Sequence, residues 1–466
     1  MINQVFASYD DYMKYLATKK IAVVGLGIGN LDFFKHLVIN GLEVTGFDKS
    51  NDFADLKEFI SSYPKASLVT GSDYLSHLKG FNIIFKTQSM KRDLPEFMEE
   101  INRSALLTSE MWEFFKYCNN KIIGITGSSG KTTTTTLVAE MLKRQGYKVW
   151  LGGNIGSPLF HKLKEIKKDD IIVLELASCQ LQMFGSKSPN ISVVTNISPN
   201  HLDFHDSYDE YIYSKSLIFK NQKSGDRLVL NYDDQTTKDF LKDTSSQVYM
   251  FSGKSKKEDP EFIGAYIKDG HIYTNIDNNI NRVLDIKDIL IPGSHNVENY
   301  MAAILATYGL VEKDAIVKTA KEFGGVEHRI EFVREINNIK FYNDSIGTTP
   351  SRTIASVEAF NQKVILITGG YDKNIPYDIM GPLIKDKVKA LVLMGQTKNK
   401  ILQAYKDYGC DIPVFEVDNM EDAVNMAYKA ASDYDIVIMS PASASFDMYK
   451  NFEEKGNIFK KIVLSL

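Results

Sequence analysis

Short apolar segments alternate with segments of helical periodicity along nearly the whole chain. This alternation predicts βαβ units, in which parallel strands are joined by helices that cover the faces of a sheet. A chain of 466 residues is too long for a single hydrophobic core, and about 150 residues per domain suggests three domains. We therefore expect an α/β protein with three domains.

The domain boundaries are placed where the pattern changes. Residues 1–107 begin with the strand Ile21–Val24, a glycine turn and a second strand ending at Asp48, which predicts a Rossmann-like domain. Residues 108–325 carry a strand, a glycine-rich loop and a helix, and predict a central P-loop ATPase-like parallel sheet. A C-terminal Rossmann-like domain is predicted over 326–466, with strands at 340–342, 364–368, 390–394 and 435–439.

The glycine turn of the first region, Gly25-Leu-Gly27-Ile-Gly29, leaves two interpretations open. The third glycine of a dinucleotide-binding turn would stand at position 30, which is an asparagine, so NAD is only weakly indicated. The glycines would equally serve close packing of strand against helix. In the central region, Asp269-Gly270 between two apolar runs predicts a β-hairpin.

The most specific motif is Gly127-Ser-Ser-Gly130-Lys131-Thr132, between the apolar strand 121–125 and a helical segment at 133–144. Glycines let backbone N–H groups converge on a phosphate, a lysine offsets the charge of the β- and γ-phosphates, and a hydroxyl holds Mg²⁺. The longer form of this motif is not met, because Ile125 stands where its first glycine would be. The shorter form in this context still predicts a site for a nucleoside triphosphate.

Polar residues downstream of this loop suggest a metal site. Glu175 ends an apolar strand, and an acid at that position commonly holds Mg²⁺ next to a phosphate loop. The pattern His201-x-Asp203-x-His205 resembles a metal cluster, but Pro199-Asn200 before it favours a loop, which makes this interpretation weak and leaves at least one histidine ordinary. Lys215 lies on a helical stretch, where a lysine by itself usually faces solvent.

Composition and charge exclude several classes of protein. A formal net charge of −4 provides no positive field to hold nucleic acid. The three cysteines stand far apart, which speaks against a zinc ribbon or a disulfide framework. The N-terminal segment lacks the apolar core of a signal peptide, and no apolar run approaches the roughly 20 residues that span a bilayer. We expect a soluble, cytoplasmic protein without an integral membrane segment.

Nine motifs occur in the order found in the Mur ligase family, and the chain resembles that family over nearly its whole length. The family consists of ATP-dependent, amide-forming enzymes of peptidoglycan precursor synthesis. Within it, the chain is most similar to members that attach D-glutamate. The motifs are Gly127–Thr133, Gly152–Gly156, Leu174–Leu181, Asn196–Asp203, Gly293–Asn299, Glu327–Glu331, Asn343–Ser345, Gly369–Lys373, and Ser440–Asp447 with Asn451–Gly456.

The resemblance implies a reaction and its participants. D-glutamate would be joined to UDP-N-acetylmuramoyl-L-alanine through an acyl phosphate, with ATP converted to ADP and phosphate. Two Mg²⁺ ions would be needed, and Lys215 would carry a carbamate derived from CO₂, which supplies the oxygen ligands that Mg²⁺ prefers. The protein would act as a monomer, and NAD is not expected.

The resemblance also implies a role for each matching residue. Catalysis would rest on Lys131, Glu175, His201 and Lys215, and metal binding on Thr132, Glu175, His201 and the Lys215 carbamate. ATP would be bound by Gly127, Ser128, Ser129, Gly130, Lys131, Thr132, Thr133, Asn296, Asn299, Arg329 and Asp344. The UDP substrate would contact Gly27, Gly29, Asp48, Lys49, Asn154 and Gln180. The acceptor amino acid would contact Thr348, Lys373, Ser445 and Phe446.

Several positions depart from the family pattern. Ala177 and Cys179 replace a serine and a phenylalanine, and Asn200 stands where aspartate is frequent before the histidine. Ile346-Gly347 replaces a Lys-Ala pair near the acceptor, and Lys86-Thr-Gln-Ser89 lies where Ser-Pro-Gly is usual. These changes put the contacts made at these positions in question. The alternative functions are another Mur-type ligase, a folylpolyglutamate-type ligase, or a non-catalytic nucleotide-binding regulator on the same fold.

Overall fold

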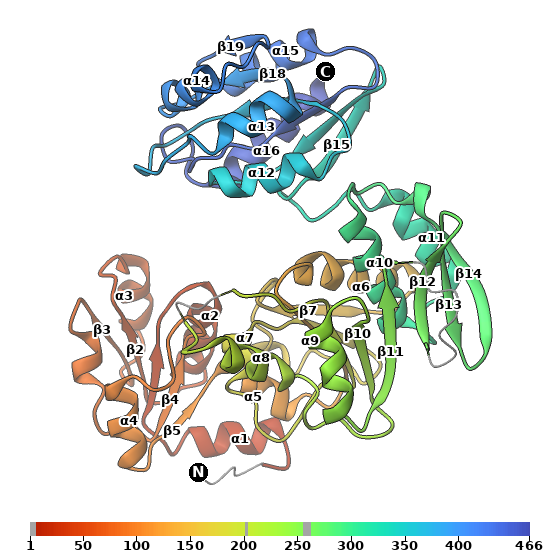
Figure 1. The fold of residues 1–466 in the computed structure, drawn as a ribbon. Helices are drawn as coiled ribbons and strands as arrows, with labels where there is room; N and C mark the ends of the chain where they lie inside the picture. Colours follow the sequence, from red (N-terminus) through yellow and green to blue (C-terminus); the bar gives the residue numbers. More distant parts are fainter. Residues whose placement is uncertain (1–5, 201–203, 255–261) are drawn as a thin grey trace. The chain divides into compact units, whose positions relative to one another are not determined.

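The computed structural model describes residues 6–200, 204–254 and 262–466, and its strands form three sheets (Figure 1). The described residues fall into two compact units. The first unit holds the described residues up to Val283 together with Asn299–Ile316, and the second holds Leu284–Glu298 and Val317–Leu466. The predicted α/β class, with sheets that are mainly parallel, is confirmed.

The first sheet has five parallel strands in the order β3-β2-β1-β4-β5. Helices cover both of its faces: α2 packs with Ile21 and Val23 on one side, and α4 packs with Ala22 and Val24 on the other. The strands are β1 (Ile21–Val24), β2 (Val44–Asp48), β3 (Ala66–Thr70), β4 (Ile83–Lys86) and β5 (Leu106–Thr108); the helices are α1 (Tyr9–Leu16), α2 (Ile28–Ile39), α3 (Ala54–Ile60), η1 (Tyr74–His77), α4 (Pro95–Asn102) and α5 (Glu110–Tyr117).

The second sheet has nine strands in the order β14-β13-β12-β11-β10-β9-β6-β8-β7. The predicted hairpin at Asp269-Gly270 is confirmed, because β12 and β13 pair antiparallel there. Its strands are β6 (Lys121–Thr126), β7 (Val149–Gly153), β8 (Ile171–Glu175), β9 (Ile191–Val194), β10 (Arg227–Asn231), β11 (Gln247–Ser252), β12 (Gly264–Lys268), β13 (His271–Ile276) and β14 (Asn279–Asp285). The helices of this part of the chain are α6 (Lys131–Gln145), η2 (Phe160–Lys162), α7 (Ser178–Leu181), α8 (Tyr208–Ser216), α9 (Gln235–Asp239), η3 (Phe240–Asp243), η4 (Ile286–Asp288), α10 (Ser294–Thr307) and α11 (Lys313–Glu322).

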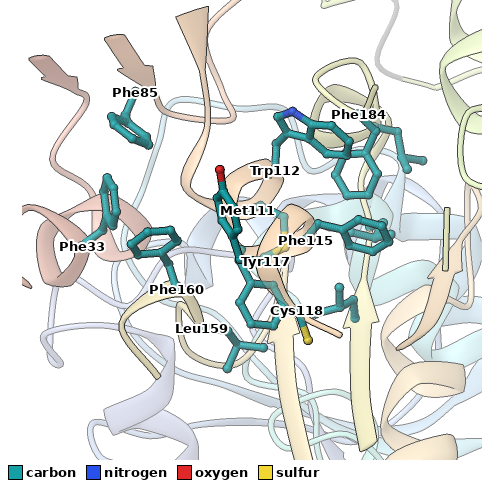
Figure 2. Close-up of a cluster of buried hydrophobic side chains, with 14 of the residues drawn as sticks. Phe33, Phe85, Met111, Trp112, Phe115, Tyr117, Cys118, Leu159, Phe160 and Phe184 are labelled. Atoms are coloured by element: carbon teal, nitrogen blue, oxygen red, sulfur yellow. The ribbon is translucent and has the colours of Figure 1, made fainter. Parts of the chain in front are cut away.

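One apolar core joins the first two sheets within the first unit (Figure 2). Phe33 of α2 and Phe85 of β4 lie with their ring centroids 4.7 Å apart, and Phe33 meets Phe160 of η2 edge-on at 5.1 Å. Trp112 and Phe115 of α5 extend the same cluster. Buried aromatic side chains contribute large apolar areas to folding, so this shared core stabilises the packing of the two sheets against each other.

The third sheet belongs to the second unit and has the order β15-β16-β20-β17-β18-β19. Only the β15–β16 pair is antiparallel. Helices α12, α13 and α14 bury apolar residues against one face, and α15 and α16 against the other. The elements are β15 (Glu331–Ile336), β16 (Ile339–Asn343), α12 (Pro350–Glu358), β17 (Val364–Thr368), α13 (Met380–Lys387), β18 (Val388–Leu393), α14 (Lys398–Asp407), β19 (Val414–Glu416), α15 (Met420–Ala430), β20 (Ile436–Met439) and α16 (Phe452–Ser465). Among the described residues, no helix is long and apolar enough to cross a membrane.

Candidate active site

The glycine-rich loop connects β6 to α6, and its glycines are required by the space around them. Gly127 has a φ of +147°, and a Cβ there would lie 1.9 Å from the Thr195 hydroxyl oxygen. Gly130 has a φ of +79°, and its Cβ would lie 2.4 Å from Oδ1 of Asn299. Only glycine adopts these conformations readily, and only glycine fits this close to its neighbours. Asn299, one of the predicted ATP residues, therefore lies directly beside the loop.

Two lysine side chains converge on one carbonyl of this loop. Lys131, the first residue of α6, donates from Nζ to the Gly127 carbonyl oxygen at 2.8 Å and to that of Ser128 at 3.1 Å. Lys215 of α8 donates from Nζ to the same Gly127 oxygen, also at 2.8 Å. Burial of Lys215, with Lys131 close by, lowers its pKa to about 7. Lys215 is thus a buried amine, and not the solvated surface lysine that its helical position alone would suggest.

Glu175 ends β8, next to β6 in the sheet, and is 1% exposed. Its Oε1 accepts a hydrogen bond from Nδ2 of Asn154 at 2.8 Å, whereas its Oε2 has no hydrogen-bond partner in the described part of the chain. A buried carboxylate oxygen without a donor is costly unless a cation takes that place, so this carboxylate fits a divalent metal ion. Thr132 follows Lys131 in the first turn of α6.

The remaining predicted metal ligand is His201. His201, with Asp203, lies outside the described residues. Within the described ranges, no group of three His, Cys, Asp or Glu side chains is arranged to hold a metal ion. His205 is buried, with Nε2 at 2.8 Å from the Ser178 hydroxyl, in a hydrogen-bonded group between α7 and α8. The structure thus gives His205 a partner within the fold.

Tyr211 links the loop to the helix that carries Lys215, a connection that the sequence did not indicate. Its hydroxyl lies 2.8 Å from Oγ of Ser128, and its ring lies 4.7 Å below the ammonium of Lys215. Oγ of Ser128 donates to the Ser198 carbonyl at 2.9 Å, which leaves Tyr211 to donate to Ser128. One fully buried side chain therefore contacts both the phosphate loop and the buried amine.

The predicted contacts for the UDP substrate lie at the carboxyl edge of the first sheet and in the central region. Gly27 and Gly29 are exposed at the start of α2, beside the point between β1 and β4 where the strand order reverses and where ligands of such sheets bind. The Asp48 carboxylate accepts from the backbone N–H of Leu26 at 2.6 Å and holds the turn, and Lys49 is exposed. Gln180 is buried in α7, and its Nε2 has no hydrogen-bond partner in the described part.

Lys86 shows how the departure at positions 86–89 is accommodated. It is 2% exposed at the end of β4, and its Nζ donates to the carbonyls of Thr87 at 3.2 Å and Met90 at 2.8 Å. Burial lowers its pKa to about 8. The lysine thus holds together the turn in which the usual proline and glycine are absent.

In the second unit, three loops at the carboxyl ends of β16, β20 and β17 are joined by backbone hydrogen bonds. Ala442 N–H donates to the Gly347 carbonyl, Gly369 N–H to that of Pro441, and Tyr371 N–H to that of Ala444, each at 2.8 Å. We call these loops, residues 344–353, 369–373 and 440–447, the rim. All four residues predicted to bind the acceptor lie on the rim: Thr348, Lys373, Ser445 and Phe446.

The rim combines exposed and buried polar groups. Lys373 is exposed, and Phe446 is 64% exposed with its ring centroid 5.9 Å from that of Tyr371. Ser445 is 2% exposed, and its hydroxyl has no hydrogen-bond partner among the described residues. Beneath the rim, the buried Lys455 donates from Nζ to the Gly369 carbonyl at 2.8 Å, and burial lowers its pKa to about 8.

The other residues predicted for ATP also belong to the second unit. The Asp344 carboxylate is buried and accepts from the Ser440 hydroxyl at 2.6 Å, and burial raises its pKa to about 6. Arg329 is exposed on the segment before β15, and Asn296 is buried near the start of α10. The first unit therefore brings together Gly127–Thr133, Glu175, Lys215, Asn154 and Asn299, and the second brings together Asp344 and the acceptor residues.

Two family models match the chain. Residues 125–307 match the Mur ligase middle domain, which begins within β6 just before the glycine-rich loop. Residues 328–443 match the Mur ligase glutamate ligase domain, which covers all six strands of the third sheet and two of the three loops of the rim. The matched segments therefore contain the residues named for the first unit, together with Asp344, Thr348 and Lys373, whereas Ser445 and Phe446 follow the second segment.

Relatives and solved structures agree with these matches. The chain is 49% identical over 466 residues to UDP-N-acetylmuramoylalanine–D-glutamate ligase of Acetivibrio thermocellus, covering 98% of both chains. It is 46% identical to the ligase of the same name from Ruminiclostridium cellulolyticum, over 98% of this chain and 99% of that one. Its fold is similar to that of UDP-N-acetylmuramate-alanine ligase of Thermotoga maritima, with a TM-score of 0.57, 18% identity, and coverage of 96% of this chain and 99% of that chain.

Proposed function

This chain belongs to the Mur ligase family, and we propose that it joins D-glutamate to UDP-N-acetylmuramoyl-L-alanine, with conversion of ATP to ADP and phosphate. The observation that carries the proposal is the 49% identity, over 98% of both chains, with a ligase of that name. The same likeness disfavours a folylpolyglutamate-type ligase and a non-catalytic regulator. The reaction belongs to peptidoglycan precursor synthesis, and we place it in the cytoplasm with the enzyme acting as a monomer.

The proposal divides the work among three regions. Residues 1–107 would receive the UDP end of the first substrate, at Gly27, Gly29, Asp48 and Lys49. Residues 108–325 would bind ATP, and residues 326–466 would bind the acceptor amino acid and complete the ATP site. Asn154 and Gln180 would hold the muramoyl-alanine portion, and the unpartnered Nε2 of Gln180 supports this because a buried amide needs an acceptor.

The chemistry begins with activation of a carboxylate. The terminal carboxylate of UDP-N-acetylmuramoyl-L-alanine attacks the γ-phosphorus of ATP, the bond to ADP breaks, and an acyl phosphate forms. The amine of D-glutamate then attacks the acyl carbon, loses a proton, and inorganic phosphate leaves. Water must be excluded meanwhile, because it would hydrolyse the acyl phosphate.

The glycine-rich loop would bind and orient the triphosphate. Backbone N–H groups of Gly127, Ser128, Ser129 and Gly130 would cradle its oxygens, with the hydroxyls of Thr132 and Thr133 beside them. Lys131 would leave the Gly127 and Ser128 carbonyls to meet the phosphates, where its charge offsets the negative charge that develops during transfer. Asn296, Asn299, Arg329 and Asp344 would hold the rest of the nucleotide.

Lys215 would be carbamylated. A neutral amine is required, because it attacks CO₂ with formation of an N–C bond and loss of a proton. A pKa of about 7 supplies that neutral amine near neutral pH. Thr132, Glu175, His201 and the Lys215 carbamate would hold two Mg²⁺ ions, which neutralise phosphate charge when bound. The unpartnered Oε2 of Glu175 supports this set.

One assay tests the proposal. Purified enzyme with ATP and Mg²⁺ should release phosphate only when both UDP-N-acetylmuramoyl-L-alanine and D-glutamate are present. Phosphate release with a folate substrate and glutamate would indicate the folylpolyglutamate-type ligase. If neither pair of substrates causes phosphate release, the protein would be a regulator. Release with both proposed substrates but equally with L-alanine as acceptor would contradict the assignment of D-glutamate.

A further inference from the structure

An arginine on the rim has so far no role in the proposed reaction. Arg352 lies in the first turn of α12, is exposed, and donates from its guanidinium to the carbonyl oxygen of Ile346 at 3.4 Å. Ile346 lies in the same loop as Thr348, and Thr348 N–H donates to the Ile346 carbonyl at 2.8 Å. The guanidinium and the predicted acceptor residue Thr348 thus share one backbone oxygen.

We propose that Arg352 binds one carboxylate of the acceptor amino acid and so selects a dicarboxylic acceptor; this rests on the proposed function. The substrate class that it implies is an amino acid with a second carboxylate on its side chain. Lys373, on the loop that follows β17, binds the other carboxylate.

The charge on Arg352 is available to a ligand. Among the described residues, no carboxylate forms an ion pair with Arg352. Asp344, in the same rim loop, is 1% exposed and accepts hydrogen bonds from the Ser440 hydroxyl and from Ile330 N–H. A guanidinium has five N–H donors, and the bond to Ile346 uses one of them. Enough donors remain for a two-point contact with a carboxylate.

The rim also needs a second cation in order to bind a dicarboxylate. Removing a carboxylate from water is costly unless a donor or a cation replaces the lost hydration. Lys455 is bound to the Gly369 carbonyl beneath the rim, with Asp447 as the acid that interacts with it. Ile346 itself offers no charge, at a position where lysine is usual. Arg352 and Lys373 are exposed, whereas Lys455 is buried.

Hydrogen bonds join the loops that carry these two cations. Gly347, five residues before Arg352, accepts from Ala442 N–H, and Thr353 Oγ1 lies 2.8 Å from Oγ of Ser440. The 440–447 loop is joined in turn to the loop of Lys373 through Tyr371 N–H. Two cations on loops that are joined in this way favour acceptors that carry two carboxylates.

The test compares Arg352→Gln with Arg352→Lys. Glutamine keeps an N–H donor but carries no charge, whereas lysine keeps the charge but cannot make the two-point contact of a guanidinium. The KM for D-glutamate should rise at least about tenfold in Arg352→Gln and less in Arg352→Lys, with the KM values for ATP and the UDP substrate within about twofold. Arg334→Gln is the matched control, because that guanidinium also donates to a carbonyl, that of Leu464 at 2.9 Å.

Three outcomes would overturn the inference. An unchanged KM for D-glutamate in Arg352→Gln would remove the contact, and so would equal effects of the glutamine and lysine variants. A larger rise in the KM for ATP than for D-glutamate would assign Arg352 to the nucleotide. Thermal unfolding of each variant checks that the variant is folded. If Arg352→Gln is unfolded, the salt dependence of the KM for D-glutamate, compared between Arg352→Lys and the unaltered enzyme, replaces the measurement on Arg352→Gln. The proposed function fails separately, if the unaltered enzyme shows no D-glutamate-dependent phosphate release.

Discussion

The glycine-rich loop of the first unit and the rim of the second unit treat their cations in opposite ways. At the loop, the ammonium groups of Lys131 and Lys215 are both bound to the Gly127 carbonyl. On the rim, Lys373 and Arg352 are exposed, and the buried Ser445 hydroxyl has no partner in the described part. The loop is organised before any substrate arrives, whereas the rim keeps groups available for one. Changes at the loop should therefore lower turnover, and changes on the rim should raise the KM for the acceptor.

The largest effect is expected for Lys131→Ala. It removes the cation that meets the transferring phosphoryl group, and such charges contribute about a thousandfold or more to the rate. Phosphate release in the presence of both substrates should fall at least that far. Lys143→Ala is the control, since that lysine lies on the same helix and forms an ion pair with Glu140 at the surface. Turnover near that of the unaltered enzyme would remove the loop from the chemistry.

Lys215→Ala should have the next largest effect, about a hundredfold in kcat, because the oxygen ligands of the carbamate are lost. Acetate or formate should restore part of the activity by occupying the vacated position. Lys187→Ala is a matched control, since Lys187 is a partly buried lysine that also donates to backbone carbonyls, those of Phe115 and Cys118. Full activity without added carboxylate would argue against a carbamate.

The carbamate itself can be followed by pH. The ammonium form of Lys215 cannot attack CO₂, so the reaction needs the neutral amine. With a pKa of about 7, the neutral share grows as the pH is raised through about 7 and shrinks below it. With ¹³C-labelled bicarbonate, a carbamate NMR signal should grow from about pH 6 to about pH 8 and be absent in Lys215→Ala. A signal that is equally strong in that variant would belong to another amine.

Lys455→Met tests whether the buried lysine beneath the rim supports acceptor binding, and an intermediate effect on the KM for D-glutamate is expected. The ammonium holds the Gly369 carbonyl and lies beneath the loop of Lys373. Its removal should raise the KM for D-glutamate about tenfold, because one positioning charge is lost, while kcat changes less. Steady-state kinetics with D-glutamate varied would show this. A fall in kcat without a change in this KM would place Lys455 outside acceptor binding.

Tyr211→Phe should have the smallest effect. It deletes one hydrogen bond to Ser128 while leaving the ring beneath Lys215. A hydrogen bond of this kind contributes about 1 kcal/mol, so kcat should fall about fivefold. Tyr208→Phe removes a nearby hydroxyl that donates to the Ile197 carbonyl and serves as control. Equal effects of the two variants would show that the link to the loop has no special part.

The sequence predicted the strands that are covered on both faces of their sheet. The runs at 121–125, 171–175 and 364–368 all became central strands, because strands covered on both faces must be apolar throughout. The edge strands β15 and β19 were missed. Their residues are mostly half-buried, and β19 has only three residues, so neither carries a continuous apolar run.

The candidate site was predicted in the same uneven way. Motif residues such as Gly127 and Lys131 could be identified from sequence because their spacing is fixed by the phosphate. Tyr211 and Arg352 could not, because a tyrosine or an arginine on a helix has the same pattern whether it faces solvent or a site. Only the folded chain shows that Tyr211 reaches Ser128, 83 residues earlier in the sequence.

The central claim is that the glycine-rich loop delivers the γ-phosphate of ATP to a carboxylate and not to water. Positional isotope exchange tests it most directly, with ATP labelled with ¹⁸O at the β,γ-bridge, UDP-N-acetylmuramoyl-L-alanine present and D-glutamate absent. Reversible formation of the acyl phosphate predicts that the label moves from the bridge to non-bridging positions of the β-phosphate, and that it stays in place without the UDP substrate. Label that stays in the bridge with the UDP substrate present, in enzyme that turns over normally once D-glutamate is added, would contradict the account.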